Sequence, residues 1–356
     1  MSNVFGLCSD LHFHDWAAFS EDDEHGVNMR FRGLLSELKR CAEETKAAGG
    51  KRIYCAGDVF HTRNQLSPLI LNPVIDTFKE LVEQGFEFRI ISGNHDLARR
   101  DSERLSSAVT ALEMPGVTIA NEAIGFNDDN VMMIPWFDKV ADLEGQINAA
   151  ASIMDKENPP TLIIHAPVNG VIPGLPDTGI DPAWLAGLGF KRVFSGHYHA
   201  HKAFPGEVYS IGALAHHTWS DVGTKAGFLI ISDDEVKFFK SRLPEFLDLD
   251  QLSAFDPAEI PLLVDGNYVR VKTELSKASD IEKMRKELVD WGAKGTLIRS
   301  MPKAKVERKS GIATSISGGA SITKSVVDYV NAQPFKNKDR VNDECAKVIA
   351  EAGVVA

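Results

Sequence analysis

Short apolar runs alternate with amphipathic stretches over about the first 240 residues of the chain. Runs rich in Val, Ile and Phe that are bounded by turn residues predict β-strands. We expect strands at Val4–Ser9, Arg52–Ala56, Glu87–Ile91, Val117–Ile119, Val131–Ile134, Thr161–Ile164, Arg192–Phe194, Glu207–Ser210, Ala226–Ile231 and Glu235–Lys240. The alternation of these strands with helical patterns predicts an α/β layered domain.

Helical periodicity separates several of these strands. Over Met29–Ala48 the apolar residues recur on one helical face, and Gly49 provides the usual carboxyl-terminal stop. A second helix is expected over Pro68–Gln84 and a third near Ser102–Glu113. Helices therefore lie between strands along the chain, as a domain of packed sheets and helices requires.

The composition changes after about residue 245, where a polar segment leads into a smaller unit. Strand patterns at Tyr268–Lys272 and Thr296–Ser300 enclose a helical pattern at Ser279–Trp291, which predicts a β-α-β module. Basic residues follow, and Lys303–Lys309 either contacts DNA or a partner or forms a charged linker. Two helical patterns separated by Pro334 complete the chain. We therefore expect three parts, at residues 1–245, 246–302 and 303–356.

The chain has 356 residues and a net charge of −11. Such acidity disfavours a protein that coats DNA, but not an enzyme that meets phosphate through bound cations. The amino terminus lacks a signal-peptide pattern and no apolar run is long enough for a bilayer, so we expect a cytoplasmic protein without membrane contact. Cys8 and Cys55 lie in apolar runs, and no Cys-x-x-Cys pair occurs, which favours simple buried thiols.

Five segments place candidate metal ligands directly after predicted strands. They are Asp10-Leu11-His12, Gly57-Asp58-Val59-Phe60-His61, Gly93-Asn94-His95-Asp96, His165 and Gly196-His197-Tyr198-His199. Ligands collect at the carboxyl ends of strands in α/β folds, so we expect these segments to converge. Asp10 and His12 are two residues apart, as are His197 and His199, so each pair would face one side of an extended chain. Glycines precede three of the ligands and permit sharp turns.

The ligand set consists of Asp, His and Asn without Cys, which suits Mn²⁺, Fe²⁺ or Zn²⁺, with Mg²⁺ as a further alternative. About seven candidates exceed the needs of one ion, whereas two ions that share a carboxylate account for all of them. We take Asp58 as the shared ligand. Taken singly, each segment has a simpler explanation as a turn, a cap or a buried histidine. Their joint order at strand ends favours a metal centre.

This order of motifs resembles the calcineurin-like metallophosphoesterase superfamily over about residues 4–240. The resemblance implies a four-layer α-β-β-α sandwich, here followed by a small α+β capping module and a helical tail. It implies one metal ion held by Asp10, His12, Asp58 and His199, and a second held by Asp58, Asn94, His165 and His197. It also implies that His95 protonates the leaving oxygen or stabilises the transition state. The alternative is that His95 only orients Asp58 or a phosphate.

Within the superfamily, Gly57-Asp58-Val59-Phe60-His61 resembles the nuclease subunits that work with SbcC-type coiled-coil ATPases in DNA repair and recombination. In that branch His61 helps to position the DNA backbone, and the alternative is a histidine that orients Asp58. Ile134-Pro135-Trp136 and Tyr209-Ser210-Ile211-Gly212-Ala213 extend the likeness. The helical tail resembles the segment that grips the ATPase, although it could equally pack on its own domain.

Further residues are candidates for contact with DNA. Arg99, Arg100 and Arg104 follow the third motif and could hold backbone phosphates, or could form a solvated helix face. His217 either touches DNA or is partly buried. The predicted function is a Mn²⁺-dependent DNA nuclease that acts with an SbcC-type ATPase, with a homodimer as a further arrangement. The alternatives are a small-molecule phosphodiesterase or phosphatase and a non-catalytic scaffold, and the intact ligand set disfavours the scaffold.

Overall fold

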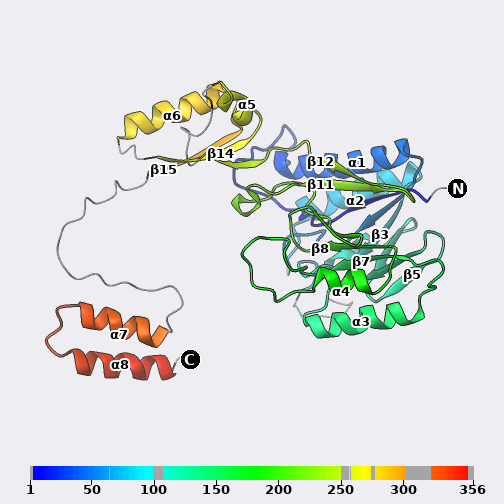
Figure 1. Ribbon diagram of the computed structural model, residues 1–356. Coiled ribbons are helices and arrows are strands. Elements are labelled where there is room, and N and C mark those ends of the chain that lie inside the picture. Colours follow the sequence, from blue (N-terminus) through cyan, green and yellow to red (C-terminus); the bar gives the residue numbers. More distant parts are fainter. Residues whose placement is uncertain are drawn as a thin grey trace. The chain divides into compact units, whose positions relative to one another are not determined.

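The computed structural model describes residues 3–63, 65–98, 107–249, 256, 258–273, 277–300 and 322–351. Residues 1–301 form one compact unit and residues 302–356 form a second. The first unit is built around two six-stranded sheets (Figure 1). The basic stretch Lys303–Lys309 lies outside the described residues.

The first sheet has the strand order β12-β11-β1-β2-β3-β4. Its parallel strands are β1 (Phe5–Cys8), β2 (Arg52–Cys55), β3 (Glu87–Ile91) and β4 (Val117–Ala120). The strand β11 (Gly227–Ile231) pairs antiparallel both with β1 and with the edge strand β12 (Val236–Lys240). The helices α1 (Met29–Ala47) and α2 (Pro68–Glu83) pack on its outer face. The short helix η2 (Ala108–Leu112) precedes β4.

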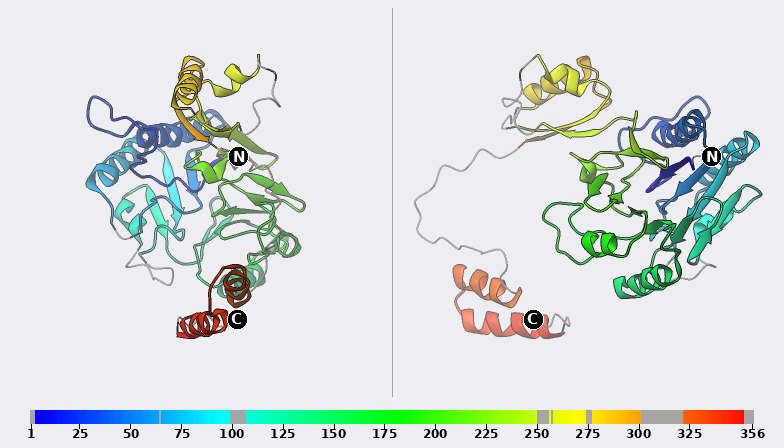
Figure 2. Two further views of the ribbon diagram at one scale, coloured as in Figure 1. Left: turned by 90° about the vertical axis from the view of Figure 1, so that its left-hand side faces the viewer. Right: turned by 45° about the vertical axis from the view of Figure 1, so that its right-hand side comes forward.

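The second sheet has the strand order β5-β6-β7-β8-β10-β9. Its parallel strands are β6 (Val131–Ile134), β7 (Thr161–His165), β8 (Arg192–Gly196) and β10 (Val208–Ser210). Its antiparallel edge strands are β5 (Ile124–Phe126) and β9 (Lys202–Phe204). The helices α3 (Val140–Ile153) and α4 (Pro182–Gly187) cover its outer face, opposite to α1 and α2 (Figure 2).

Hydrophobic side chains fill the three interfaces between the four layers. Leu7 and Phe194 lie between the two sheets and are fully buried. Phe78 of α2 packs on Phe88 of β3 with ring centroids 4.7 Å apart, and Ile147 of α3 belongs to the opposite outer interface. Because the central strands are buried on both faces, their sequences are mostly apolar and lack a strict alternation of apolar and polar residues. This arrangement confirms the expected α-β-β-α sandwich.

The capping module adds a three-stranded parallel sheet. Its strands are β13 (Phe246–Asp248), β14 (Tyr268–Thr273) and β15 (Gly295–Ser300), and its helices are α5 (Ile260–Val264) and α6 (Ala278–Asp290). The predicted β-α-β unit is therefore present, with β13 as an additional strand. Phe246 contacts Trp219 of the helix η3 (Trp219–Asp221) with ring centroids 4.8 Å apart, which joins the module to the sandwich.

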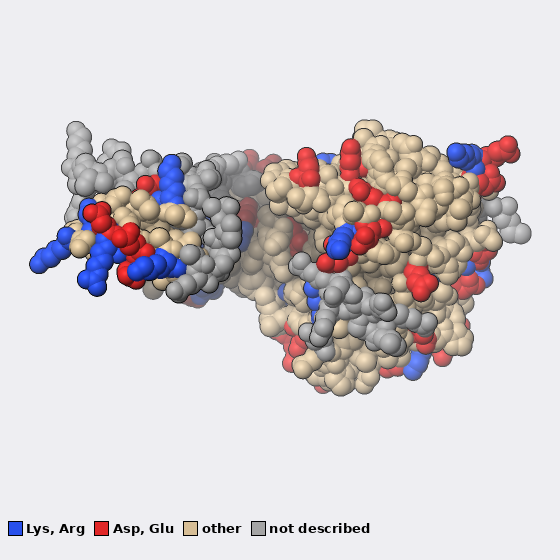
Figure 3. Space-filling model, turned by 90° about the horizontal axis from the view of Figure 1, so that it is seen from below, with Lys and Arg blue, Asp and Glu red and all other residues tan. Residues whose placement is uncertain are grey.

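The second unit contains the helices α7 (Ile322–Ala332) and α8 (Lys338–Glu351), which pack on each other on either side of Pro334. Val330 is buried between them, whereas Tyr329 and Val348 are exposed. Basic and acidic side chains lie side by side on the face of this unit that Figure 3 shows. The two predicted tail helices are therefore both present.

Three further expectations can be compared with the structure. Near Ser102–Glu113 the described residues form the 3-10 helix η2 instead of an α-helix. Cys8 and Cys55 are buried and not in disulfides, as expected. Among the described residues, no helix combines the length and the apolar character needed to cross a bilayer.

Candidate metal centre

Hydrogen bonds from backbone amides hold together the loops that follow β1, β2 and β3. The amides of Asp10 and His12 donate to the carbonyls of Gly57 and Asp58, each at 3.0 Å. The Asp96 carboxylate accepts from the Phe60 amide at 3.0 Å and from the Gly93 amide at 2.8 Å. These contacts fix the loops that carry the first three predicted segments relative to one another at one end of the sheets.

Four of the candidate ligands adopt left-handed backbone conformations. The φ angles are 51° at Asp10, 44° at His12, 53° at Asp58 and 99° at His197. The expectation that Asp10 and His12 face one side of an extended chain was therefore wrong, although His12 Nε2 lies 3.9 Å from Asp10 Oδ1. Such conformations cost about 1–3 kcal/mol each and concentrate at functional sites. The fold tolerates this strain to aim the side chains inward.

Two glycines allow the loops to approach closely. Gly57 has a φ of +94°, and a Cβ atom there would lie 2.7 Å from His165 Nδ1. A Cβ atom on Gly93 would clash with the Asp58 carboxylate and with the His165 ring. Larger residues at either position would push the ligands apart, as the sequence pattern predicted.

Asp58 lies at the middle of the cluster. Its Oδ2 atom is 3.7 Å from His12 Nε2 and 3.5 Å from His165 Nε2. Its Oδ1 atom accepts a 2.7 Å hydrogen bond from the backbone amide of His95. One carboxylate oxygen therefore faces two separate groups of potential ligands.

The first group consists of Asp10, His12 and His199, whose ligand atoms all lie within 4.8 Å of one another. His12 Nε2 and His199 Nε2 are 3.1 Å apart. His199 Nδ1 donates to Asp221 at 2.7 Å, so the Nε2 atom of the neutral ring carries a lone pair that points at His12. Both Nε2 atoms and the Asp10 carboxylate thus lie close enough to bind one cation together.

The second group consists of Asn94, His165 and His197. Asn94 Oδ1 lies 3.1 Å from His165 Nε2 and 2.9 Å from His197 Nδ1. His165 Nδ1 donates to the carbonyl of Ala56 at 2.6 Å, which leaves a lone pair on the Nε2 atom that faces Asn94 and Asp58. Acceptors thus converge here, as they do around a bound cation.

The electrostatics of the cluster also favour cations. Burial, followed by the charges of neighbouring histidines, lowers the pKa of His12 and His165 well below the usual value. Both imidazoles are therefore neutral near pH 7, which is the form that binds metal. Burial and then the charge of Asp10 raise the pKa of Asp58 well above its usual range. Two ionised carboxylates close together repel each other when no cation is present. Bound divalent ions would instead stabilise the ionised form of both.

One buried polar atom gives a further test of fit. Asp10 Oδ1 is buried and has no hydrogen-bond partner among the described residues, although Oδ2 accepts from Ser9 at 2.6 Å and from the His197 amide at 3.0 Å. Buried carboxylate oxygens are rarely left without a partner. The oxygen and imidazole atoms present here therefore suit hard or borderline divalent ions.

His61 and His95 lie beside the first group of ligands. Their rings stack with centroids 5.3 Å apart, and His95 Nδ1 donates to the His61 carbonyl at 2.7 Å. His61 Nδ1 is 3.4 Å from His12 Nδ1. His95 is only partly buried, so its ring lies where the cluster meets solvent. Both predicted catalytic histidines are thus at the candidate centre.

His217 is buried beside the loop that carries Asp10. It is 2% exposed, and its Nε2 donates to the Asp10 carbonyl at 3.0 Å. This arrangement agrees with the buried alternative and makes His217 a support for the loop that carries Asp10. Arg99, Arg100 and Arg104 lie outside the described residues.

Two residues at the site were not expected from the sequence. The Trp16 ring stacks on the His217 ring with centroids 5.2 Å apart, and its centroid lies 4.6 Å from that of the His61 ring. Asp221 holds His199 Nδ1 and closes a capping box with Thr218. The pattern Thr218-x-x-Asp221 was a sequence signal for a cap. Nothing in the sequence linked that cap to His199.

Replacing Asp221 with alanine is expected to weaken metal binding by about 10–100-fold, the usual cost of losing a carboxylate that orients a metal-binding histidine. Burial alone would lower the pKa of His199, but the hydrogen bond with Asp221 raises it, so the imidazole depends on this partner. The measurement is a calorimetric titration of the metal-free protein with Mn²⁺.

The matched control for this variant is Asp181→Ala. Asp181 also caps a helix, by accepting from the Ala183 amide at 2.8 Å, but it lies at the start of α4. The control should lose a helix cap and keep the parental affinity for Mn²⁺. Equal affinities in the two variants would refute the orienting role of Asp221.

Comparison with known proteins agrees with this geometry. Residues 4–201 match the calcineurin-like phosphoesterase family. Exonuclease subunit 1 of Enterobacteria phage T4 is 22% identical over 197 residues, which is 53% of this chain and 54% of that protein. The chain therefore matches about half the length of this relative.

Several solved structures share low overall similarity with the chain. They include the protein TT1561 of Thermus thermophilus (TM-score 0.43, 12% identity, 68% of this chain and 100% of that one) and a dimetal phosphatase from Danio rerio (0.42, 11%, 64% and 91%). Nuclease MPE from Pseudomonas putida is similar at a TM-score of 0.26 (16%, 57% and 65%). The family assignment depends on the sequence match. The chain belongs to the calcineurin-like phosphoesterase family, whose members use a two-metal centre, and its clustered Asp and His residues are candidates for such a centre.

Proposed function

We propose that this protein is a nuclease subunit that hydrolyses phosphodiester bonds in DNA. The observation that carries the proposal is the position of Asp58 Oδ2 between two ligand groups, 3.7 Å from His12 and 3.5 Å from His165. Two ions bound there would activate a water molecule and neutralise charge on the phosphate. The proposal that the phosphate belongs to DNA draws support from the similarity to a phage exonuclease subunit.

Each ion would have its own set of ligands from this chain. One would be held by Asp10, His12, Asp58 and His199, and the other by Asp58, Asn94, His165 and His197. In the first set, His12 Nε2 and His199 Nε2 are 3.1 Å apart. In the second set, Asn94 Oδ1 lies within 3.1 Å of His165 Nε2 and His197 Nδ1. Mn²⁺ is our preferred ion, since mixed carboxylate, amide and imidazole ligands suit it.

His95 would donate a proton to the departing sugar oxygen. Its Nδ1 already donates to the His61 carbonyl, so the proton that moves would be on Nε2. The backbone amide of His95, not its ring, holds Asp58. The ring is thus not needed to orient Asp58, which favours acid catalysis over that role. His61 stacks on His95 and would position both this ring and the DNA backbone.

Partner binding is the second part of the proposal. The α7–α8 pair would bind an SbcC-type coiled-coil ATPase, and the exposed Tyr329 and Val348 are apolar side chains that such a partner would cover. The chain has a net charge of −11, and both acidic and basic side chains are scattered over the face of the larger unit in Figure 3, so an ATPase subunit would contribute to DNA binding. Co-purification with and without residues 321–356 tests this part, since only the full chain should retain the ATPase.

The substrate class is tested by comparing DNA with small phosphodiesters. With Mn²⁺, the purified protein should hydrolyse bis-p-nitrophenyl phosphate and also degrade single-stranded and plasmid DNA. A two-metal centre would act on any phosphodiester that reaches it, including a small one. Cleavage of DNA would in addition show that the protein surface around the centre admits a DNA strand. Rapid turnover of cyclic nucleotides with DNA left intact would instead support a small-molecule phosphodiesterase.

A further inference from the structure

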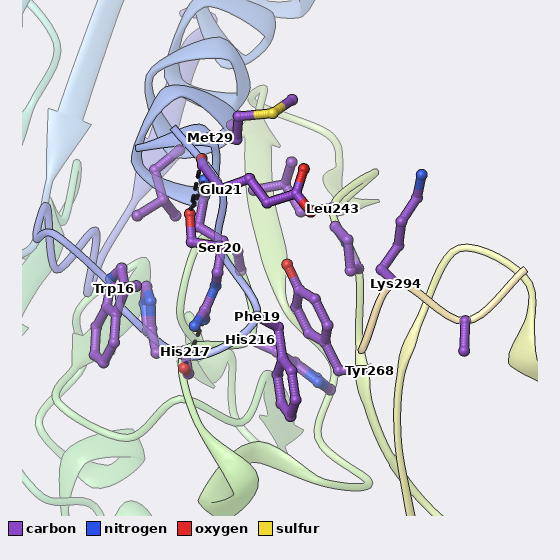
Figure 4. A pocket seen from close by; sticks show the side chains of 16 residues that line it. Trp16, Phe19, Ser20, Glu21, Met29, His216, His217, Leu243, Tyr268 and Lys294 are labelled. Carbon is purple, nitrogen blue, oxygen red and sulfur yellow. Dashed lines mark hydrogen bonds between the residues drawn. The ribbon is translucent and has the colours of Figure 1, made fainter. Parts of the chain in front are cut away.

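A pocket of about 550 Å³ adjoins the candidate metal centre (Figure 4). The loop after β1, the start of α1, the segment around His217 and the capping module line it. Two of its lining residues also belong to the surroundings of the centre. Trp16 contacts the His61 ring at 4.6 Å, and His217 donates to the Asp10 carbonyl at 3.0 Å. The pocket and the metal cluster therefore share a wall.

Flat side chains dominate the inner part of the pocket. Phe19 and Tyr268 stack with ring centroids 5.2 Å apart. The Arg30 guanidinium lies 5.4 Å from the Trp16 ring and 5.3 Å from the Tyr268 ring. Hydrogen bonds to the carbonyls of Ala18 (2.9 Å) and His217 (2.7 Å) fix its plane. These rigid planar groups are ordered before any ligand arrives, which lowers the entropic cost of binding a planar ligand.

The mouth of the pocket carries opposite charges. Glu21 and Lys294 are exposed on its two sides. Met29 also lines the pocket and is 55% exposed. A lysine at the rim suits a phosphate group, and a carboxylate suits an exocyclic amine of a nucleobase. The chemistry of the rim thus matches a nucleotide better than a purely apolar ligand.

We propose that this pocket binds an unpaired base of the DNA strand whose phosphate lies at the metal centre. The inference rests on the proposed function and adds a substrate class to it: single-stranded DNA, or duplex ends and distortions where a base can leave its pair. Bases stack on aromatic and guanidinium planes with little dependence on sequence. The volume lies within the range of small-ligand sites. A base held in its pair could not enter.

The test measures binding of a short single strand to the metal-free protein, so that no strand is cut. The same strand with abasic nucleotides serves as the comparison. For the parent protein, loss of the bases should weaken binding by about 10-fold, the order expected for lost stacking. Ala293→Phe fills the pocket from the capping module and should remove this difference. Val289→Phe is the control, because Val289 is an exposed residue of the same module.

A second variant covers the case in which Ala293→Phe fails to fold. Met29→Trp blocks the mouth from the side of α1, and Met29 is exposed enough to accept the change. Either folded variant should bind the normal and abasic strands equally. The proposal would be overturned if both variants still bound the normal strand more tightly than the abasic strand, as the parent is expected to do. It would also be overturned if the parent bound the two strands equally.

The base-binding proposal and the nuclease proposal have separate outcomes. If binding depends on the bases but DNA is not cleaved in Mn²⁺, the nuclease proposal is wrong and the base-binding proposal stands. If DNA is cleaved but binding does not depend on the bases, the nuclease proposal stands and the base-binding proposal is wrong.

Discussion

Replacing Asp58 with asparagine is expected to lower phosphodiester hydrolysis by at least about 1,000-fold, because one change removes a ligand from both ions. Asparagine has nearly the same shape and can still accept the hydrogen bond from the His95 amide. The loss should therefore come from the metals and not from the fold. Hydrolysis of bis-p-nitrophenyl phosphate and metal content by elemental analysis measure the effect.

The same variant has a stability signature. Burial and then the charge of Asp10 raise the pKa of Asp58 in the folded chain, so the folded chain binds this proton more tightly than the unfolded one. As the pH falls from neutral towards the usual pKa of an aspartate, the contribution of Asp58 to the stability of the metal-free parent should therefore rise, and the variant should lack this contribution. Near neutral pH the metal-free variant should melt no lower than the parent, but Mn²⁺ should stabilise it less.

A buried aspartate outside the centre provides the control. Asp129 accepts from the Tyr54 hydroxyl at 2.6 Å and from Arg89 at 3.0 Å, and it is 5% exposed. Asp129→Asn should lower the melting temperature and leave metal content and hydrolysis unchanged. If Asp58→Asn behaved like this control, Asp58 would not be a shared ligand.

Replacing His95 with asparagine should lower DNA cleavage by about 100–10,000-fold, the range that general acid catalysis contributes. The departing sugar oxygen is a poor leaving group and needs a proton. The p-nitrophenolate ion leaves without one, so hydrolysis of bis-p-nitrophenyl phosphate should fall much less. Metal content should remain at the parental level, because the His95 backbone amide still holds Asp58.

The comparison of the two substrates separates acid catalysis from positioning. A positioning role for His95 would lower the rates for both substrates by similar factors. Loss of metal from His95→Asn would instead make His95 a ligand, as its place in the group with His12 and His61 permits. Either result would remove the proposed acid.

Strands buried on both faces were the elements that the sequence predicted best. Glu87–Ile91 and Val131–Ile134 have the predicted bounds, since turn residues flank both segments. The edge strands β5 and β9 were missed because Ile124 and Lys202 are exposed and their strands have little apolar pattern. Their formation depends on pairing with neighbours in the folded sheet.

The candidate ligands could be found in the sequence because each one ends or follows a strand, and strand ends meet in such folds. The backbone at Asp10 and His12 could not be predicted, since their left-handed conformations depend on hydrogen bonds with the loop after β2. Asp221 was missed for a similar reason. Its contact with His199 joins positions that are distant in sequence and depends on how η3 packs.

The most direct test of the central claim is a crystal structure of the protein grown with Mn²⁺, with the ions located by anomalous scattering. We expect two peaks about 3.5–4 Å apart, with the Asp58 carboxylate in contact with both ions. His12 and His199 should bind one ion, and His165 and His197 the other. A single peak, or two peaks of which neither touches Asp58, would contradict the shared-carboxylate centre.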